Sequence, residues 1–222
     1  MRILYVTFFL VIIDQLSKIF IKGFTIPLIG YTYKGLEYGQ SIDIINNFFQ
    51  LTFIENQGMA FGLEIGGKLF LTFFTIFATI LIIYFIYKNR TGSLYLRISM
   101  AFILGGAIGN LIDRMFYGVL YGSNPLFFGK VVDFFHLKIP DFTLFGKNFH
   151  SWPIFNFADI WVTVGFILIL FGHKRIFKKE VSLEGDSESN LNATLKENDI
   201  PEKRSETLLT GISTESSGKK NV

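Results

Sequence analysis

Four apolar segments, each close to the length of a membrane-spanning helix, most constrain what this chain can fold into. They comprise residues Ile3–Ile21, Leu69–Tyr87, Leu94–Ile112 and Phe157–Gly172. About 20 apolar residues in a helix cross the roughly 30 Å hydrocarbon core of a bilayer. The second segment carries no charge, and the first and fourth are apolar nearly all round, which does not suit a surface helix of a soluble protein. The sequence therefore predicts a membrane α-helical fold with four transmembrane helices.

Composition supports this fold class and narrows the chemistry. Hydrophobic residues make up 50% of the 222 residues and charged residues 18%, against about 25% charged in soluble domains. The absence of cysteine excludes disulfides, thiol nucleophiles and thiolate metal sites. The N-terminal run imitates a signal peptide but continues into Asp14, Gln15 and Lys18 without a small-residue cleavage site. We therefore expect the first segment to remain as a helix.

Basic residues at the ends of the apolar segments indicate the orientation in the membrane. These residues are Arg2, Lys88, Arg90, Arg97, Lys174, Arg175, Lys178 and Lys179. Because Lys and Arg gather on the cytoplasmic side, both termini are expected in the cytoplasm and loops 23–67 and 113–156 outside. Residues 1–179 would form one membrane domain. Its positive charge flanks apolar runs, so we expect no nucleic-acid partner.

The loops and the tail have distinct compositions. Phe48–Ile54 has the composition of a strand and Asn56–Gly58 that of a turn, which predicts a small extracytoplasmic β-sheet. Residues 180–222 are rich in Ser, Glu, Lys, Thr and Asn and contain five basic and nine acidic residues. Such a segment buries too little apolar surface to fold, so it is predicted to be a disordered cytoplasmic tail.

Polar side chains inside the apolar pattern mark candidate sites, because burial in a membrane requires a partner or a task. Asp14 and Lys18 lie four residues apart, acid first, the favourable order for an ion pair on one helix face. The pair either anchors the first helix at the interface or supports a site or a lipid headgroup. Both alternatives remain open at this point.

The third segment carries a second polar group at its outer end. Asn110, Asp113 and Arg114 share one helix face, and Gly105–Gly109 before them forms a stripe of small residues suited to close helix packing. We expect Asp113 and Arg114 to form a structural ion pair or an orienting element.

Two aspartates stand in apolar surroundings further along the chain. Asp133 lies in KVVDFF, and Asp159 lies at the start of the fourth segment, one turn after Asn156. Taken singly, Asp133 suits a loop acid at headgroup level and Asp159 a partner of the helix dipole. Two carboxylates that approach closely share a proton, so that one acts as acid and the other as base. Such a pair can activate water for attack on a peptide carbonyl without a metal or cofactor.

Other chemistries have weaker signals. His136, His150 and His173 lack the spacing of a zinc site. A proton-coupled transporter or a small channel would distribute its acids through the thickness of the membrane, whereas these acids cluster at one boundary. A non-catalytic membrane scaffold is a third alternative.

Five stretches, in order, resemble the motifs of the lipoprotein signal peptidases, the bacterial signal peptidase II family. They are DQLSK at 14–18, ENQGMAFG at 55–62, GGAIGNLIDR at 105–114, VVDF at 131–134 and FNFAD at 155–159. The resemblance implies an intramembrane aspartic endopeptidase of the bacterial inner membrane, with its active site at the outer face. It would cut prolipoproteins just before a diacylglyceryl-modified cysteine, among membrane lipids, and globomycin would inhibit it.

The same resemblance assigns residues. The catalytic pair would be Asp133 and Asp159. The supporting polar residues would be Asp14, Lys18, Asn56, Gly58, Asn110, Arg114 and Asn156. The chain departs from the family at 115–130 and 136–153, two stretches longer than is usual there, and its tail matches nothing recognisable.

Overall fold

The structure, a computed structural model, describes residues 2–46, 48–60, 63–64, 67–139, 142–144, 147–149 and 151–172. All of these belong to one compact unit, Met1–His173. The predicted tail at 180–222, the domain boundary at 179 and the basic residues 174–179 lie outside the described residues.

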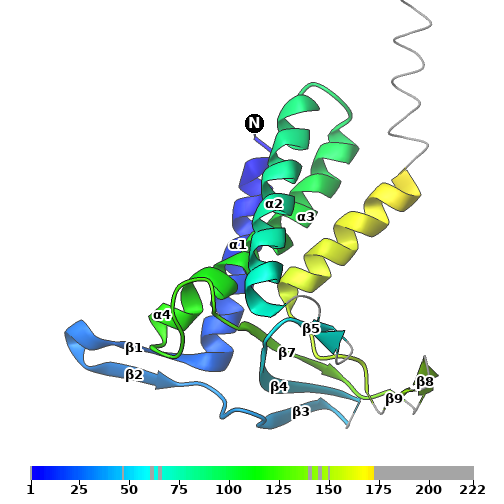
Figure 1. Cartoon of the computed structure of the whole chain (residues 1–222). Helices are drawn as coiled ribbons and strands as arrows, with labels where there is room; N and C mark the ends of the chain where they lie inside the picture. Colours follow the sequence, from blue (N-terminus) through cyan, green and yellow to red (C-terminus); the bar gives the residue numbers. More distant parts are fainter. Residues whose placement is uncertain are drawn as a thin grey trace, which may run out of the picture. The chain divides into compact units, whose positions relative to one another are not determined.

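Helices form one layer of this unit (Figure 1). Helices α1 (Leu4–Lys22) and α2 (Gly67–Lys88) both pack against α3 (Leu94–Ile112). The helix Phe157–Gly172, unlabelled and yellow in Figure 1, approaches α3 at Gly106. Among the described residues, three helices are long and apolar enough to cross a membrane, and the helix Phe157–Gly172 is shorter. The predicted membrane α-helical class is confirmed, with three candidate spans.

Helix α1 places polar residues inside and apolar residues outside. Its buried residues Thr7, Leu10, Asp14 and Lys18 recur every three or four positions and form one stripe. Its exposed large side chains are Tyr5, Phe8, Phe9, Ile13, Leu16 and Phe20. Such a helix suits a lipid environment, in which the apolar face needs no protein cover.

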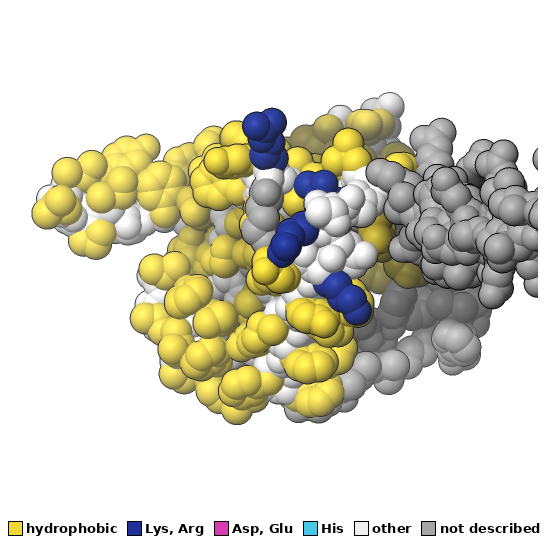
Figure 2. Space-filling view, turned by 90° about the horizontal axis from the view of Figure 1, so that it is seen from above, with side chains coloured by type: hydrophobic (Ala, Val, Ile, Leu, Met, Phe, Trp, Pro, Cys, Tyr) yellow, Lys and Arg dark blue, Asp and Glu magenta, His cyan; other side chains and the backbone are white. Residues whose placement is uncertain are grey.

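Figure 2 views the unit along its helices from the end where α1 begins. Hydrophobic side chains cover the flanks of the described part, and several Lys and Arg side chains gather on the end itself, with no described acidic side chain in view. The basic residues at this end of the helices are Arg2, Lys88, Arg90 and Arg97. The bundle therefore has one basic end.

Two short helical elements continue the third helix. After Ile112 the chain continues as a π-helix, η2 (Asp113–Tyr117), and a short α4 (Gly118–Leu120), so the loop expected to begin at residue 113 starts after Leu120. The helix predicted over Leu94–Ile112 therefore agrees with α3. Asp113 and Arg114, which were expected on the face of this helix, lie in the π-helical turn that continues it.

Short strands form a second layer at the other end of the helices (Figure 1). Strands β3 (Ser41–Ile45), β4 (Phe49–Asn56) and β7 (Val131–Leu137) form an antiparallel sheet in the order β3-β4-β7. The small sheet expected around Phe48–Ile54 is thereby confirmed.

Three further strand pairs complete the described elements. They are β1 (Gly23–Ile26) with β2 (Tyr31–Lys34), separated by the 3₁₀ turn η1 (Pro27–Ile29), then β5 (Met59–Ala60) with β6 (Leu63–Glu64), and β8 (Phe142–Leu144) with β9 (Lys147–Phe149).

The sheet joins the helices through an apolar cluster and a backbone bridge. Phe53, Val132 and Phe134 from the sheet pack with Tyr117 from η2. An isolated bridge pairs Phe135 with Phe155, which holds the start of the helix Phe157–Gly172 beside β7. Segments about 20 residues apart in the sequence therefore meet at the boundary between sheet and helices.

Glycines permit the close helix contacts, as the sequence predicts. A Cβ atom on Gly106 would lie 2.2 Å from the backbone oxygen of Ala158, and one on Gly109 would lie 2.4 Å from the Asp14 carboxylate. No side chain fits either position without movement of its neighbour. The small-residue stripe of α3 thus brings both α1 and the last helix close.

We predict that Gly106→Ala destabilises the fold by about 1–3 kcal/mol, because the added methyl group forces α3 away from the last helix. Thermal unfolding of the purified protein in detergent measures this. The control is Gly92→Ala, where the nearest atom would be 3.3 Å away. Equal unfolding temperatures for the two variants would contradict the packing role of Gly106.

Candidate active site

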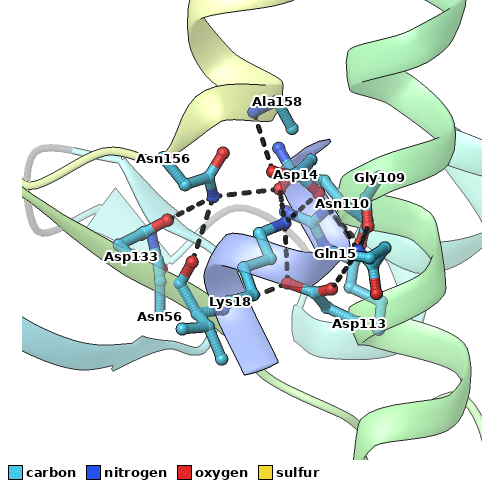
Figure 3. A network of polar contacts seen from close by, with 12 residues as sticks. Asp14, Gln15, Lys18, Asn56, Gly109, Asn110, Asp113, Asp133, Asn156 and Ala158 are labelled. Carbon is cyan, nitrogen blue, oxygen red and sulfur yellow. Dashed lines mark hydrogen bonds and ion pairs between the residues drawn. The ribbon is translucent and has the colours of Figure 1, made fainter. Parts of the chain in front are cut away.

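A buried lysine connects α1 with α3 at the boundary between helices and sheet (Figure 3). The Lys18 Nζ atom lies 2.9 Å from an Asp14 oxygen and 2.8 Å from an Asp113 oxygen, and all three side chains have no exposed surface. It also donates a hydrogen bond of 2.9 Å to the Asn110 side-chain oxygen. The expected Asp14–Lys18 pair is confirmed, but inside the protein instead of at the interface with lipid.

The two carboxylates bound to Lys18 each hold a backbone group elsewhere. Asp14 accepts a hydrogen bond of 2.9 Å from the N–H of Ala158, and Asp113 accepts one of 3.1 Å from the N–H of Val132. These two residues immediately precede Asp159 and Asp133. The cluster around Lys18 therefore fixes the backbone just before both candidate aspartates.

Two asparagine side chains connect the aspartates to each other. The Asn156 amide donates to an Asp133 oxygen at 2.6 Å and to the Asn110 side-chain oxygen at 3.1 Å. The Asn110 amide in turn donates to Asp159 at 2.9 Å. Figure 3 shows the Asn156 side chain directed toward Asp133. A continuous amide network thus spans from one carboxylate to the other.

The Asp133 carboxylate is 2% exposed and lies on β7. Its second oxygen accepts a hydrogen bond of 3.0 Å from Asn56, at the end of the paired strand β4. Burial raises the pKa of Asp133 to about 7 and the nearby charge of Asp159 adds to this, against the opposing hydrogen bonds from Asn56 and Asn156. Asp133 is therefore substantially protonated near neutral pH.

Asp159 lies in the first turn of its helix. The N–H of Asp159 donates to the Asn156 side-chain oxygen at 3.1 Å, and the Asp159 carboxylate accepts from the N–H of Asn156 at 3.1 Å. This reciprocal arrangement has the geometry of a capping box. The expected position of Asp159 in the first turn of this helix is thus confirmed. Its other oxygen accepts a hydrogen bond from Asn110.

The remaining predicted residues also lie here. The N–H of Gly58 donates to the Asn56 side-chain oxygen at 2.8 Å, and its φ of 101° favours glycine. The charge of the Arg114 guanidinium interacts with Asp113, Asp159 and Asp133. The expected Asp113–Arg114 ion pair is absent among the described residues, because the direct partner of Asp113 is Lys18.

The site residues predicted from the sequence did not include three polar residues that lie here in the structure. Asp113 completes the Lys18 cluster, and Gln15 donates to both the Asp113 carboxylate and the Gly109 carbonyl at 3.0 Å. Both residues lie within the family motifs, Gln15 in DQLSK and Asp113 in GGAIGNLIDR. Their positions in these motifs could have identified them from the sequence.

Glu55, next to Asn56, is the third addition. It pairs with Lys22 at the end of α1 and, at 3.0 Å, with Lys130. Burial tends to raise the pKa of Glu55, but hydrogen bonds from the two lysines outweigh it and leave the pKa lowered. No group of metal-ligating side chains occurs within the described ranges.

Comparisons with known proteins agree with this geometry. A family model for signal peptidase (SPase) II matches residues 6–174. The chain belongs to the signal peptidase II family. As a member of that family, it is a peptidase.

Individual relatives extend the comparison. A lipoprotein signal peptidase of Porphyromonas gingivalis is 33% identical over 88% of this chain and 91% of the relative. One of Pelodictyon phaeoclathratiforme is 40% identical over 64% and 77%.

A solved structure described as a bacterial membrane enzyme at 2.3 Å resolution is 30% identical. The superposition covers 78% of this chain and 88% of the solved chain, with a TM-score of 0.57. Together with the candidate spans, this likeness identifies a multi-pass membrane protein.

We predict that Lys18→Met destabilises the protein by about 3–5 kcal/mol, because it leaves Asp14 and Asp113 as unpaired buried charges. Cleavage activity should also fall, because the backbone before Asp133 and before Asp159 would no longer be held by the cluster around Lys18. Thermal unfolding and peptidase assays test this, with the exposed Lys88→Met as the matched control. Wild-type stability of Lys18→Met would contradict the organising role of the cluster.

Proposed function

We propose that this chain is an aspartic endopeptidase that removes signal peptides from prolipoproteins just before a diacylglyceryl-modified cysteine, with Asp133 and Asp159 as its catalytic pair. The observation that carries the proposal is the network joining the two carboxylates through Asn110 and Asn156. Asp133 and Asp159 also interact through their charges, as a proton-sharing pair requires.

The raised pKa of Asp133 supports a division of roles. Asp133 would carry the shared proton, while Asp159 would be the anion, which the helix N-terminus favours. Asp159 would take a proton from a water molecule as the water oxygen attacks the scissile carbonyl carbon, and Asp133 would donate its proton to the carbonyl oxygen. The resulting gem-diol would collapse as Asp159 passes its proton to the leaving nitrogen, Asp133 takes a proton back from one hydroxyl group and the C–N bond breaks.

Supporting residues would hold this geometry. Asn56 and Asn156 donate to the two Asp133 oxygens, which fixes the plane of the carboxyl group. The positive charge of Arg114 near both aspartates would stabilise the negative charge of the pair. Gly58 would keep the Asn56 turn in place, and the Lys18 cluster would hold the backbone segments.

Location at a membrane boundary suits this substrate. We propose four transmembrane helices, with Phe157–Gly172 as the fourth, in a bacterial inner membrane. The basic end of the bundle in Figure 2 supports cytoplasmic termini and an active site at the outer face. The acyl chains of the substrate would stay in lipid while water reaches the scissile bond from outside. Globomycin would inhibit by occupying the aspartate pair.

We predict that Asp133→Asn and Asp159→Asn each reduce cleavage of a diacylglyceryl-modified prolipoprotein by about 10²–10⁴-fold, the usual contribution of a general acid or base. Purified variants and the wild-type enzyme are compared by product formation at equal concentrations. The matched control is Asp43→Asn, a carboxylate on the exposed strand β3.

Undiminished cleavage by either site variant would contradict the pair. A folded wild-type protein without any cleavage activity would favour a proton-coupled transporter or a scaffold.

A second prediction concerns pH. Because Asp133 must be protonated to act as the acid, kcat/KM should fall as pH rises through about 7. The Asn56 hydrogen bond lowers the pKa of Asp133, so Asn56→Ala should raise this pKa and shift the alkaline limb to higher pH. The control is Asn89→Ala, since the Asn89 amide donates to the Phe85 carbonyl at 2.9 Å. A limb that stays in place or moves to lower pH would contradict the assignment of the acid.

A further inference from the structure

We propose that a cavity beneath the β1–β2 hairpin binds a bilayer phospholipid with a net anionic headgroup. The cavity has a volume of about 830 Å³ and lies between the end of α1, the hairpin and the segment 117–121. Its walls include residues of the segment 23–34 and of the segment 117–121. The proposal does not depend on the roles of Asp133 and Asp159.

The hairpin is suited to contact with lipid. It follows α1 directly, and therefore begins at the end of a candidate membrane span. Leu28 and Ile29 at its tip are 94% and 69% exposed, and Tyr31 is 50% exposed. Figure 2 shows this hairpin as a projecting lobe covered mostly by hydrophobic side chains. Aromatic and apolar residues at the end of a membrane span favour the membrane–water interface. A bilayer lipid is therefore the molecule available to fill the cavity.

The charges that line the cavity are positive. Lys22 and Lys34 belong to its walls, and no acidic residue does. Lys22 and Lys130 both form ion pairs with the Glu55 carboxylate. The three side chains together therefore carry one net positive charge. Lys34 is exposed and has no ion pair within the part of the chain that the structure describes. An anionic headgroup would complement these charges.

A buried hydroxyl group adds independent support. Tyr117 lines the cavity and is 3% exposed, and its hydroxyl has no hydrogen-bond partner among the described residues. Nearby, the Tyr121 hydroxyl donates to the Gly23 carbonyl at 2.9 Å, and the Tyr121 ring lies 4.1 Å from the Lys22 Nζ atom. Burial of an unsatisfied hydroxyl is costly. A phosphate oxygen in the cavity would provide the missing acceptor.

The apolar part of the wall favours a lipid over a free phosphate ion. Ile19, Phe24 and Leu120 line the same cavity and would contact the glycerol backbone and the first methylene groups. The cavity is also far larger than one phosphate group. A bound lipid would hold the hairpin at the membrane surface and stabilise its junction with η2 and α4.

Native mass spectrometry of the full chain, released from bilayers of mixed phosphatidylglycerol and phosphatidylcholine, tests the proposal. The wild type should retain one phosphatidylglycerol in preference to phosphatidylcholine. Lys34→Gln should weaken this retention about fivefold, as expected for one lysine near an anionic lipid. Tyr117→Phe should weaken it about tenfold through the lost hydrogen bond to a charged group.

Controls separate this site from other lipid contacts. Two control variants change exposed residues of α2 that do not line the cavity, Lys88→Gln and Tyr84→Phe. Both should retain the lipid as the wild type does. Lys34→Gln changes an exposed side chain, so its melting temperature should equal that of the wild type, and it remains informative if Tyr117→Phe fails to fold.

Equal retention of the two lipids by the wild type, or unchanged retention by Lys34→Gln, would overturn the proposal. So would displacement of the lipid by excess inorganic phosphate, or binding of a soluble prolipoprotein-derived peptide at this cavity in place of lipid.

Discussion

The site depends on one buried ionic cluster. Lys18 forms ion pairs with both Asp14 and Asp113 without access to water, and an unpaired charge at this depth would be strongly destabilising. Each carboxylate uses its remaining hydrogen-bonding capacity on a backbone N–H, of Ala158 or of Val132. The same interactions that make burial of the charges tolerable therefore hold the two segments that carry Asp133 and Asp159.

The second constraint is the sharing of amide groups between the aspartates. Asn156 caps the last helix through its side-chain oxygen and binds Asp133 through its amide nitrogen. One side chain thus couples the start of a helix to a strand of the sheet. The two coupled carboxylates have different environments, because Asp133 is buried on β7 whereas Asp159 lies at a helix N-terminus. Different environments are what allow one carboxyl group to hold a proton while the other is ionised.

Much of this arrangement could be predicted from the sequence, and the failures have a common cause. The membrane class, the small sheet and the glycine stripe of α3 follow from hydropathy and residue size, which act locally. The ion pair expected between Asp113 and Arg114 was predicted wrongly, because a local pattern pairs a charge with its neighbour in the sequence. In the structure the charge finds Lys18, 95 residues earlier in the chain.

The sequence by itself determined that this chain enters a membrane, that its polar residues gather at one boundary, and which residues its family motifs contain. Those conclusions rest on periodicity, charge and motif order, all of which are properties of a linear chain. Only the tertiary structure decided that Asp133 and Asp159 share one amide network, and that burial raises the pKa of Asp133. Burial and hydrogen bonding depend on distances between segments far apart in sequence, and spacing along the chain does not specify those distances.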